Sequence, residues 1–220
     1  MCFSANASFI TAGVLTIIGL ISVSISRTRS EQLLSLTAFF FAIQQATEGF
    51  LWLNLPSGNT IISTFATYLY LFYVYFFWPL WMPLVVSFYE QDWLRKIAMY
   101  ICTLAGFFIA LYGLQALVIN GAYAKIEHLH IQYIFNVPFP FIFGLLLNTL
   151  YCIATIIPLL ICSRPLVWIC GVTLAASYVI SQIFYYAFFT SVWCFFGSLT
   201  SLLILYIIYY NHTNRKVMKK

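Results

Sequence analysis

One acidic side chain stands inside a long apolar stretch of this sequence. Glu48 lies seven residues before the end of a run that closes at residue 55, roughly 10 Å below the nearer surface if that run is a membrane-spanning helix. Gln44, Gln45, Glu48 and Trp52 recur at spacings of three and four, so they share one helix face. An ionisable group at this depth is costly unless it faces protein or water, which makes Glu48 the first candidate for a functional site.

Other strong polar residues lie at a similar depth when each apolar run is followed in its own direction. They are Gln115, Asn148, Tyr178, Ser181 and Gln182. Together with Glu48 they predict a polar pocket in the outer half of a bundle, open to the outside. The alternative is a hydrogen-bonded set that holds helices together around a protonated Glu48.

Cysteine and histidine supply a second set of candidates. Cys2 and Cys194 are both expected at the outer face, where an oxidising compartment would allow a disulfide between them. They could instead bind a metal together with His128, His130 and Glu48, ligand types that suit zinc, copper or haem iron. The alternative for the two histidines is a solvated loop. Four other cysteines lie within the apolar runs or at their cytosolic ends, and they are expected to be small buried hydrophobes: Cys102, Cys152, Cys162 and Cys170.

Composition identifies the solvent that surrounds these residues. Of the 220 residues, 63% are hydrophobic and 7% are charged, and the mean hydropathy is +0.95. Soluble domains carry roughly a quarter charged residues, so this chain cannot cover a surface in water. Lipid offers no partners to backbone polar groups, and uninterrupted apolar runs longer than about 18 residues indicate helices and not a barrel.

The runs predict a single all-α domain, a polytopic transmembrane bundle of about seven helices. We place the spans near residues 8–26, 32–55, 60–88, 96–119, 139–162, 165–188 and 192–210. The connections are short except for residues 120–138, which we expect to be a long loop. Pro79 and Pro83 predict a kink in the third span, because neither can donate a backbone hydrogen bond.

Positive charge alternates between the connections. One set carries Arg27, Arg29, Arg95, Lys96, Arg164, Arg215, Lys216, Lys219 and Lys220, and the other carries Lys125. By the positive-inside rule this division places the N-terminus outside and the C-terminus in the cytosol. The net charge of +5 therefore reports topology and not nucleic-acid binding. The expected partners are the lipid bilayer and a small molecule or ion. No cleavable secretory signal is expected, since the N-terminus has no basic region.

Three segments resemble the pattern of a known family. The opening Met1-Cys2-Phe3-Ser4-Ala5, the segment Gln44-Gln45-Ala46-Thr47-Glu48-Gly49 and the later Trp193-Cys194-Phe195 are similar to an uncharacterised family of bacterial multi-pass membrane proteins that begin Met-Cys-Phe-Ser-Ala. The resemblance spans most of the chain and implies a bacterial inner (cytoplasmic) membrane. It implies no mechanism, because no activity is attached to that family.

Three functions are consistent with these residues. The first is binding of a small ligand or ion at Glu48 for transport or sensing, with Gln44, Gln45 and Gln182 as hydrogen-bonding groups. The second is a membrane-embedded metal-dependent or redox enzyme, in which Glu48 serves as acid or base. The third is a non-catalytic accessory subunit. Retinal proteins are set aside because the last span has no lysine, and b-type cytochromes because no expected span contains a histidine.

Overall fold

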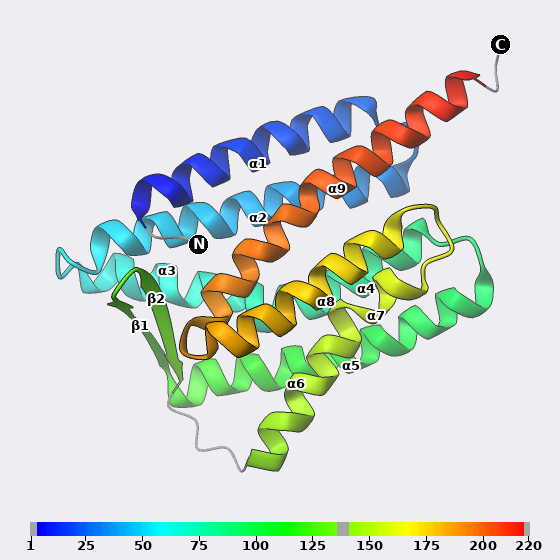
Figure 1. The fold of residues 1–220 in the computed structure, drawn as a ribbon. Coiled ribbons are helices and arrows are strands. Elements are labelled where there is room, and N and C mark those ends of the chain that lie inside the picture. Colours follow the sequence, from blue (N-terminus) through cyan, green and yellow to red (C-terminus); the bar gives the residue numbers. More distant parts are fainter. Residues whose placement is uncertain (1–3, 136–140, 218–220) are drawn as a thin grey trace.

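The computed structural model describes residues 4–135 and 141–217, which form a bundle of long helices with a two-stranded hairpin at one end (Figure 1). The uninterrupted rods are α1 (Ala5–Ile25), α2 (Arg29–Asn54), α5 (Trp93–Asn120), α8 (Val167–Phe184) and α9 (Phe189–Val217). One interrupted rod consists of α3 (Thr60–Phe72), η1 (Tyr73–Phe77) and α4 (Trp78–Tyr89), and the other of α6 (Phe141–Thr155) and α7 (Ile157–Ile161). The expected helical bundle of membrane type is confirmed.

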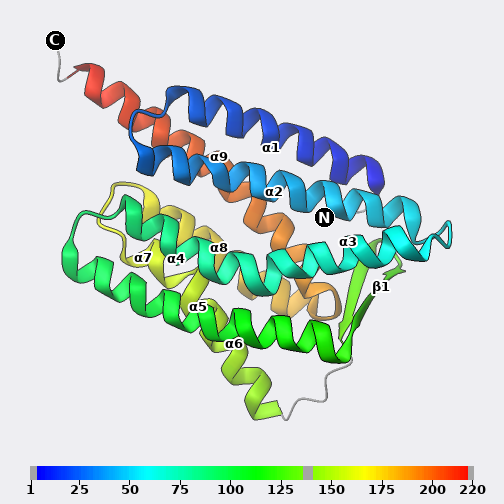
Figure 2. The ribbon, with the colours of Figure 1, turned by 180° about the vertical axis from the view of Figure 1, so that it is seen from behind.

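The connections gather at two opposite ends of the bundle, as Figures 1 and 2 show from opposite sides. The hairpin end, as we call it, holds the start of α1, the α2–α3 turn, strands β1 (Ala122–Glu127) and β2 (His130–Phe135), and η2 (Tyr186–Phe188) between α8 and α9. The basic end holds the α1–α2, α4–α5 and α7–α8 connections and the end of α9. All the described basic residues except Lys125 belong to the basic end.

Helix α2 packs against α1, α3, α4 and α9. In the described part of the chain, six helical rods are long and apolar enough to cross a membrane, and α2 is not among them. Its burial explains its polarity, because Thr37, Gln44, Gln45 and Glu48 are shielded from lipid by the neighbouring helices. A count of about seven spans, with α2 as the seventh, stays a prediction.

The rod that contains Pro79 changes its hydrogen-bond pattern just before this residue. In η1, a π-helical segment, the N–H of Trp78 donates to the carbonyl of Tyr73, five residues back. The next donor in this register would be Pro79, which has no N–H, so the carbonyl of Val74 requires another partner. Tyr151 on α6 donates its hydroxyl to Val74 O at 2.9 Å. The proline therefore creates the point at which α6 is hydrogen-bonded to the middle of this rod.

Helix α5 comes very close to the same rod because two of its glycines face it. A Cβ at Gly106 would lie 2.0 Å from the carbonyl oxygen of Pro79, and one at Gly113 would lie 2.6 Å from Cβ of Tyr75. Small residues permit this close approach between membrane helices. The η1–α4 segment is thus held from two sides, by α5 and by Tyr151.

The connection 120–138, expected to be a loop, contains the β1–β2 hairpin. The strands pair antiparallel with Glu127 opposite His130, so the turn consists of His128 and Leu129. His128 has a positive φ of 55°. Ala124 and Ile131 are buried against the bundle, whereas Lys125 and Glu127 form an exposed ion pair of 2.7 Å. Pairing supplies hydrogen-bond partners to the backbone of a connection that covers the end of the bundle.

The expected span 139–162 is interrupted. Helix α6 ends at Thr155, and α7 begins at Ile157, after one intervening residue, with Pro158 in its first turn. Because Pro158 cannot donate to the end of α6, the two helices are separate pieces of one rod.

Candidate functional site

Glu48 lies on the face of α2 that points into the bundle, and its side chain is fully buried. Ser191 in the first turn of α9 donates a hydrogen bond from its hydroxyl to Oε1 of Glu48. The spacing along α2 directs Glu48 inward, and the α8–α9 turn brings Ser191 to it from a segment 143 residues later. The acid therefore faces a polar group of another helix and not lipid.

Gln44 extends this contact by one turn of α2. Its Oε1 accepts a hydrogen bond from Trp78 Nε1 at 2.8 Å, and its side chain lies close to the thiol of Cys194. Cys194 lies one turn after Ser191 on α9 and also interacts with the hydroxyl of Tyr70. Two successive turns of α2 thus face two successive turns of α9 through polar groups.

Three tyrosines from other elements complete the arrangement. The hydroxyl of Tyr75 is hydrogen-bonded with Thr190, that of Tyr70 donates to Thr190 O at 3.5 Å, and that of Tyr151 lies near Cys194 and Tyr75. We use the term Glu48 cluster for Gln44, Glu48, Tyr70, Tyr75, Tyr151, Ser191 and Cys194.

Sequence analysis missed the three tyrosines of this cluster. The chain contains 16 tyrosines, and the rotation of each helix decides which of them face inward. A usable signal was the proline at position 79, because the carbonyl that it leaves without a backbone donor requires a hydroxyl from elsewhere.

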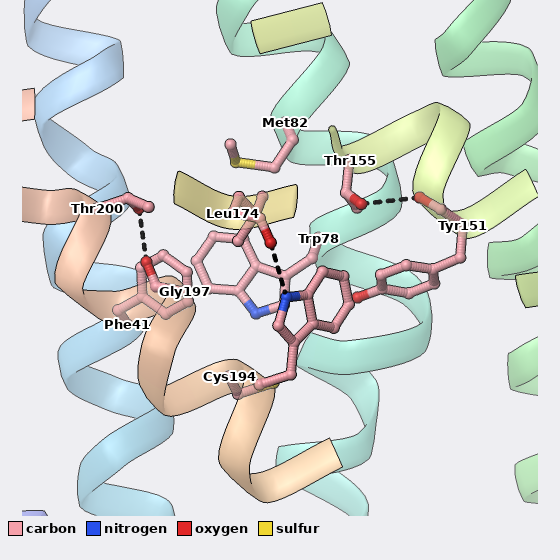
Figure 3. Close-up of a pocket in the computed structure, with 10 residues that line it drawn as sticks. Phe41, Trp78, Met82, Tyr151, Thr155, Leu174, Cys194, Gly197 and Thr200 are labelled. Atoms are coloured by element: carbon pink, nitrogen blue, oxygen red, sulfur yellow. Dashed lines mark hydrogen bonds between the residues drawn. The ribbon is translucent and has the colours of Figure 1, made fainter. Parts of the chain in front are cut away.

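A small cavity adjoins the Glu48 cluster (Figure 3). Its volume is about 30 Å³, which is room for one or two water molecules. Trp78, Tyr151 and Cys194 form part of its wall. Thr155 and Thr200 also line it, but each donates its hydroxyl proton to a carbonyl of its own helix, so toward the cavity they can only accept hydrogen bonds. The rest of the wall is mostly apolar and includes Phe41, Met82 and Leu174, so the cavity offers a guest few polar groups.

The hairpin covers the cluster at its end of the bundle. The ring of Tyr133 stacks on that of Tyr70 with centroids 4.5 Å apart, and Ile131 is fully buried with Leu51. The ring of His130 stacks on Phe188 at 4.7 Å. Because Glu48 and Gln44 have no exposed surface beneath this cover, the pocket expected to open outward is closed in this structure.

The remaining expected ligand-binding residues lie in three other places. Gln182 donates to the hydroxyl of Tyr178 at 3.3 Å and Asn148 lies close to the same hydroxyl, in a separate half-buried group between α6 and α8. Gln115 is exposed on α5. Trp52 packs against the hairpin beside Leu51. Of the residues expected around Glu48, the structure brings Gln44 to it directly along α2.

The expected metal and disulfide residues are only partly described. Cys2 lies outside the described residues, so both its disulfide with Cys194 and its part in a metal site stay predictions. Within residues 4–135 and 141–217, no three His, Cys, Asp or Glu side chains are grouped closely enough to hold a metal ion. Cys194 belongs to the Glu48 cluster, whereas His128 lies exposed at the hairpin turn.

Two further acids are buried at the basic end, where sequence analysis placed no site. Glu31 caps α2: Oε2 accepts hydrogen bonds from the N–H groups of Arg27 and Thr28, and Oε1 accepts one from Asn211 at 3.4 Å. Asn211 also donates to the hydroxyl of Tyr89 at 2.5 Å. This group ties the start of α2 to the ends of α4 and α9.

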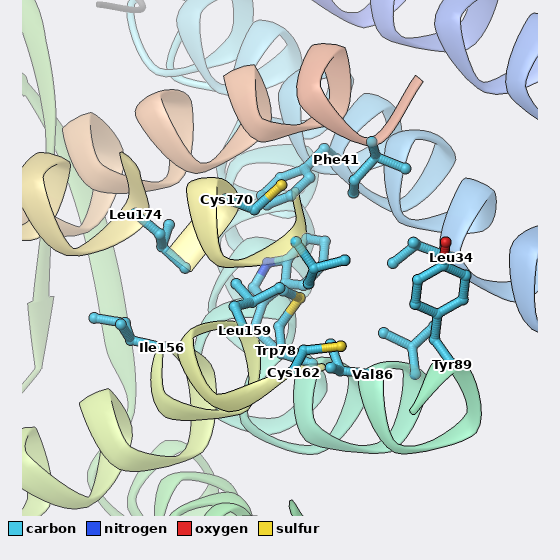
Figure 4. Close-up of a cluster of buried hydrophobic side chains, with 14 of the residues drawn as sticks. Leu34, Phe41, Trp78, Val86, Tyr89, Ile156, Leu159, Cys162, Cys170 and Leu174 are labelled. Atoms are coloured by element: carbon cyan, nitrogen blue, oxygen red, sulfur yellow. The ribbon is translucent and has the colours of Figure 1, made fainter. Parts of the chain in front are cut away.

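Glu90 joins the α4–α5 and α7–α8 connections. Its carboxylate accepts hydrogen bonds from the N–H groups of Gln91, Asp92 and Ser163 and from the hydroxyl of Ser163. Burial alone would raise the pKa of Glu90, but these hydrogen bonds outweigh it and lower the pKa to about 2. The apolar core continues directly below, where Figure 4 shows Tyr89, Val86 and Cys162 together.

Fold and site define a class: a helical membrane protein that holds a glutamate and several hydroxyl groups in the middle of its bundle. The chain belongs to a family described as Family of unknown function (DUF6629), whose pattern matches residues 1–219. This finding confirms the expected membership in an uncharacterised family. No curated protein and no solved structure matches the chain.

Proposed function

We propose that the protein binds a small ligand or ion at the Glu48 cluster and uses this binding for transport or sensing across a bacterial inner membrane. In this proposal the hairpin end faces outward and the basic end faces the cytosol. The observation that carries the proposal is the contact between the fully buried Glu48 and Ser191 on α9, within a set of polar side chains from α2, the α3–α4 rod, α6 and α9.

The chemistry of the cluster favours a guest that exchanges a proton or carries positive charge. A carboxyl group accepts hydrogen bonds when ionised and donates one when protonated, and the hydroxyl of Ser191 can serve as partner in either state. The nearby hydroxyls of Tyr70 and Tyr75 and the thiol of Cys194 can likewise donate or accept. A proton is the smallest guest that meets these conditions, and the cavity beside Cys194 has room for water that would carry it.

The elements that enclose the site suggest that part of the protein moves when a guest binds. The closed hairpin must open, or the α9 start must shift, before a guest larger than a proton can reach Glu48. The π-helical η1 segment adjoins the cluster, and such segments are frequent at functional sites because their hydrogen bonds are easily rearranged. Tyr151 and the α5 glycines hold that segment in the closed arrangement.

Tryptophan fluorescence offers a direct test, because Trp78 donates to Gln44 inside the cluster. The full-length protein in lipid nanodiscs would be titrated with acid and, at fixed pH, with sodium, potassium and magnesium ions. We expect a saturable change with at least one of these probes in the wild type and in Glu31→Gln, a control that alters an acid at the other end. Glu48→Gln should abolish that change. An identical response in Glu48→Gln would remove the proposal.

A further inference from the structure

We propose that the basic end contains a binding site for a phosphate group, supplied by the headgroup of an anionic phospholipid, at Arg95 and Arg164. This inference is independent of the Glu48 cluster, which lies deeper in the bundle. It rests on how the two arginines are held and on what their guanidinium groups leave unused.

The two arginines join the α4–α5 and α7–α8 connections, because each donates a hydrogen bond to a carbonyl beside the other connection. Arg95, in the first turn of α5, donates from Nη1 to the carbonyl of Ile161 at the end of α7, at 2.8 Å. Arg164, in the α7–α8 connection, donates from Nε to the carbonyl of Tyr89 at the end of α4, at 3.1 Å, and lies 5.4 Å from the centre of the Tyr89 ring. Both side chains are therefore fixed in place before any ligand arrives.

Neither guanidinium is paired with a carboxylate of the described residues. The described side chains form one ion pair, Lys125–Glu127, and it lies at the hairpin end. The two nearby acids are occupied by other donors: Glu90 by four hydrogen bonds from the connections, and Asp92 by the N–H of Arg95 at the start of α5. Each guanidinium has five N–H donors and uses one of them, so most of its planar fork is available for a phosphate.

The backbone at this place adds to the positive potential. Helix α8 begins at Val167, three residues after Arg164, and its first turn has no side-chain cap. The positive end of an 18-residue helix thus lies beside Arg164. Leu166, which precedes α8, has a positive φ of 69°, a strained conformation for leucine that sets the direction of this turn.

Two tryptophans indicate that the source of the phosphate is a lipid. Trp93 and Trp168 follow the same two connections and are 67% and 53% exposed. Exposed tryptophans at the ends of membrane helices lie at the level of the lipid headgroups. A phosphate at that level, beside two fixed arginines, is that of a phospholipid. Arginine suits this role better than lysine because its fork binds two phosphate oxygens at once.

Native mass spectrometry of the detergent-purified protein would test the site with phosphatidylglycerol as the probe. We expect the Arg95→Gln/Arg164→Gln variant to retain this lipid at least about tenfold more weakly than the wild type, which is the loss expected when charge-assisted hydrogen bonds are removed. Arg29→Gln, an exposed basic-end arginine without a described hydrogen bond, is the matched control and should retain the lipid.

A second variant separates the effect of the guanidinium forks on phosphate binding from the effects of lost charge and of misfolding. Arg95→Lys/Arg164→Lys keeps both charges, so it should fold, yet lose most of the affinity because the forks are gone. Equal retention in the wild type and in both double variants would overturn the site. If inorganic phosphate displaces the lipid in proportion to its concentration, the site recognises phosphate as proposed. If inorganic phosphate binds and the lipid does not, the lipid is the wrong source and that part of the proposal falls.

Discussion

Glu90 at the basic end and Glu48 toward the hairpin end are both buried glutamates, yet their surroundings differ in kind. Glu90 accepts one hydroxyl hydrogen bond and three backbone N–H hydrogen bonds from two connections, and the N–H groups can only donate, which favours a carboxylate. Glu48 is bonded by the hydroxyl of Ser191, which suits a carboxylate and a carboxylic acid equally. The comparison separates an acid that fixes loops from an acid whose protonation can change without loss of its partner.

The largest expected difference is that the hairpin end is accessible from outside the cell and the basic end is not, which gives an all-or-none labelling result. A cysteine introduced by Ser57→Cys, in the α2–α3 turn, should react with an impermeant maleimide added outside intact cells. One introduced by Thr213→Cys, near the end of α9, should react only after the membrane is opened. The parent chain, with its native cysteines, provides the background. The reverse labelling pattern would invert the assignment of outer and inner ends.

Glu90 should have the larger effect on stability of the two acids. Its folded-state pKa of about 2 lies below the ordinary value of 4.5, so the carboxylate stabilises the fold at and above pH 4.5. That contribution is lost as the pH falls from 4.5 toward 2, and by linkage it amounts to about 3 kcal/mol. Thermal unfolding in detergent between pH 7 and pH 2 should show this loss in the wild type.

Two variants check the cause of that pH dependence. Glu90→Gln should be less stable than the wild type by a similar amount at pH 7 and should lose this part of the dependence. Glu127→Gln removes an exposed carboxylate paired with Lys125 and should leave stability nearly unchanged, because exposed ion pairs contribute little. A steep acid dependence that persists in Glu90→Gln would assign the effect to another group.

Tyr151→Phe should have a smaller effect than Glu90→Gln. It removes the hydroxyl that donates to Val74 O and leaves that carbonyl without the donor that Pro79 cannot supply. The expected loss of stability is about 1–2 kcal/mol, measured by thermal unfolding at pH 7. Tyr186→Phe, in the exposed α8–α9 turn, is the control and should be neutral. No change in Tyr151→Phe would mean that Val74 finds another donor.

The sequence predicted the helices and the inward face of α2 well, because long apolar runs and spacings of three and four depend only on local geometry. Pro79 likewise marked the place where the third rod changes its hydrogen bonding. The hairpin was not predicted: its six-residue strands are short, and their alternation is weak beside the long apolar runs.

The partners of the site could not be predicted either, since they depend on how helices are rotated and paired. Nothing local shows that Ser191, rather than Gln115 or Asn148, faces Glu48. Glu31 and Glu90 were overlooked because they lie at helix ends, where an acid resembles an ordinary surface charge. Their burial follows from the way the connections meet at the basic end.

The most direct test of the account is infrared spectroscopy of the Glu48 carboxyl group across pH, with Glu48→Gln as the reference for assigning its band. Glu48→Gln keeps the size of the side chain and its hydrogen bonds, so unfolding temperature and monodispersity should be nearly unchanged. We predict that the Glu48 band of the wild type appears and disappears with pH while the protein stays folded, as a site that takes up and releases a proton requires. A carboxyl band that is constant over the whole range would show that Glu48 only joins α2 to α9, and it would contradict the account.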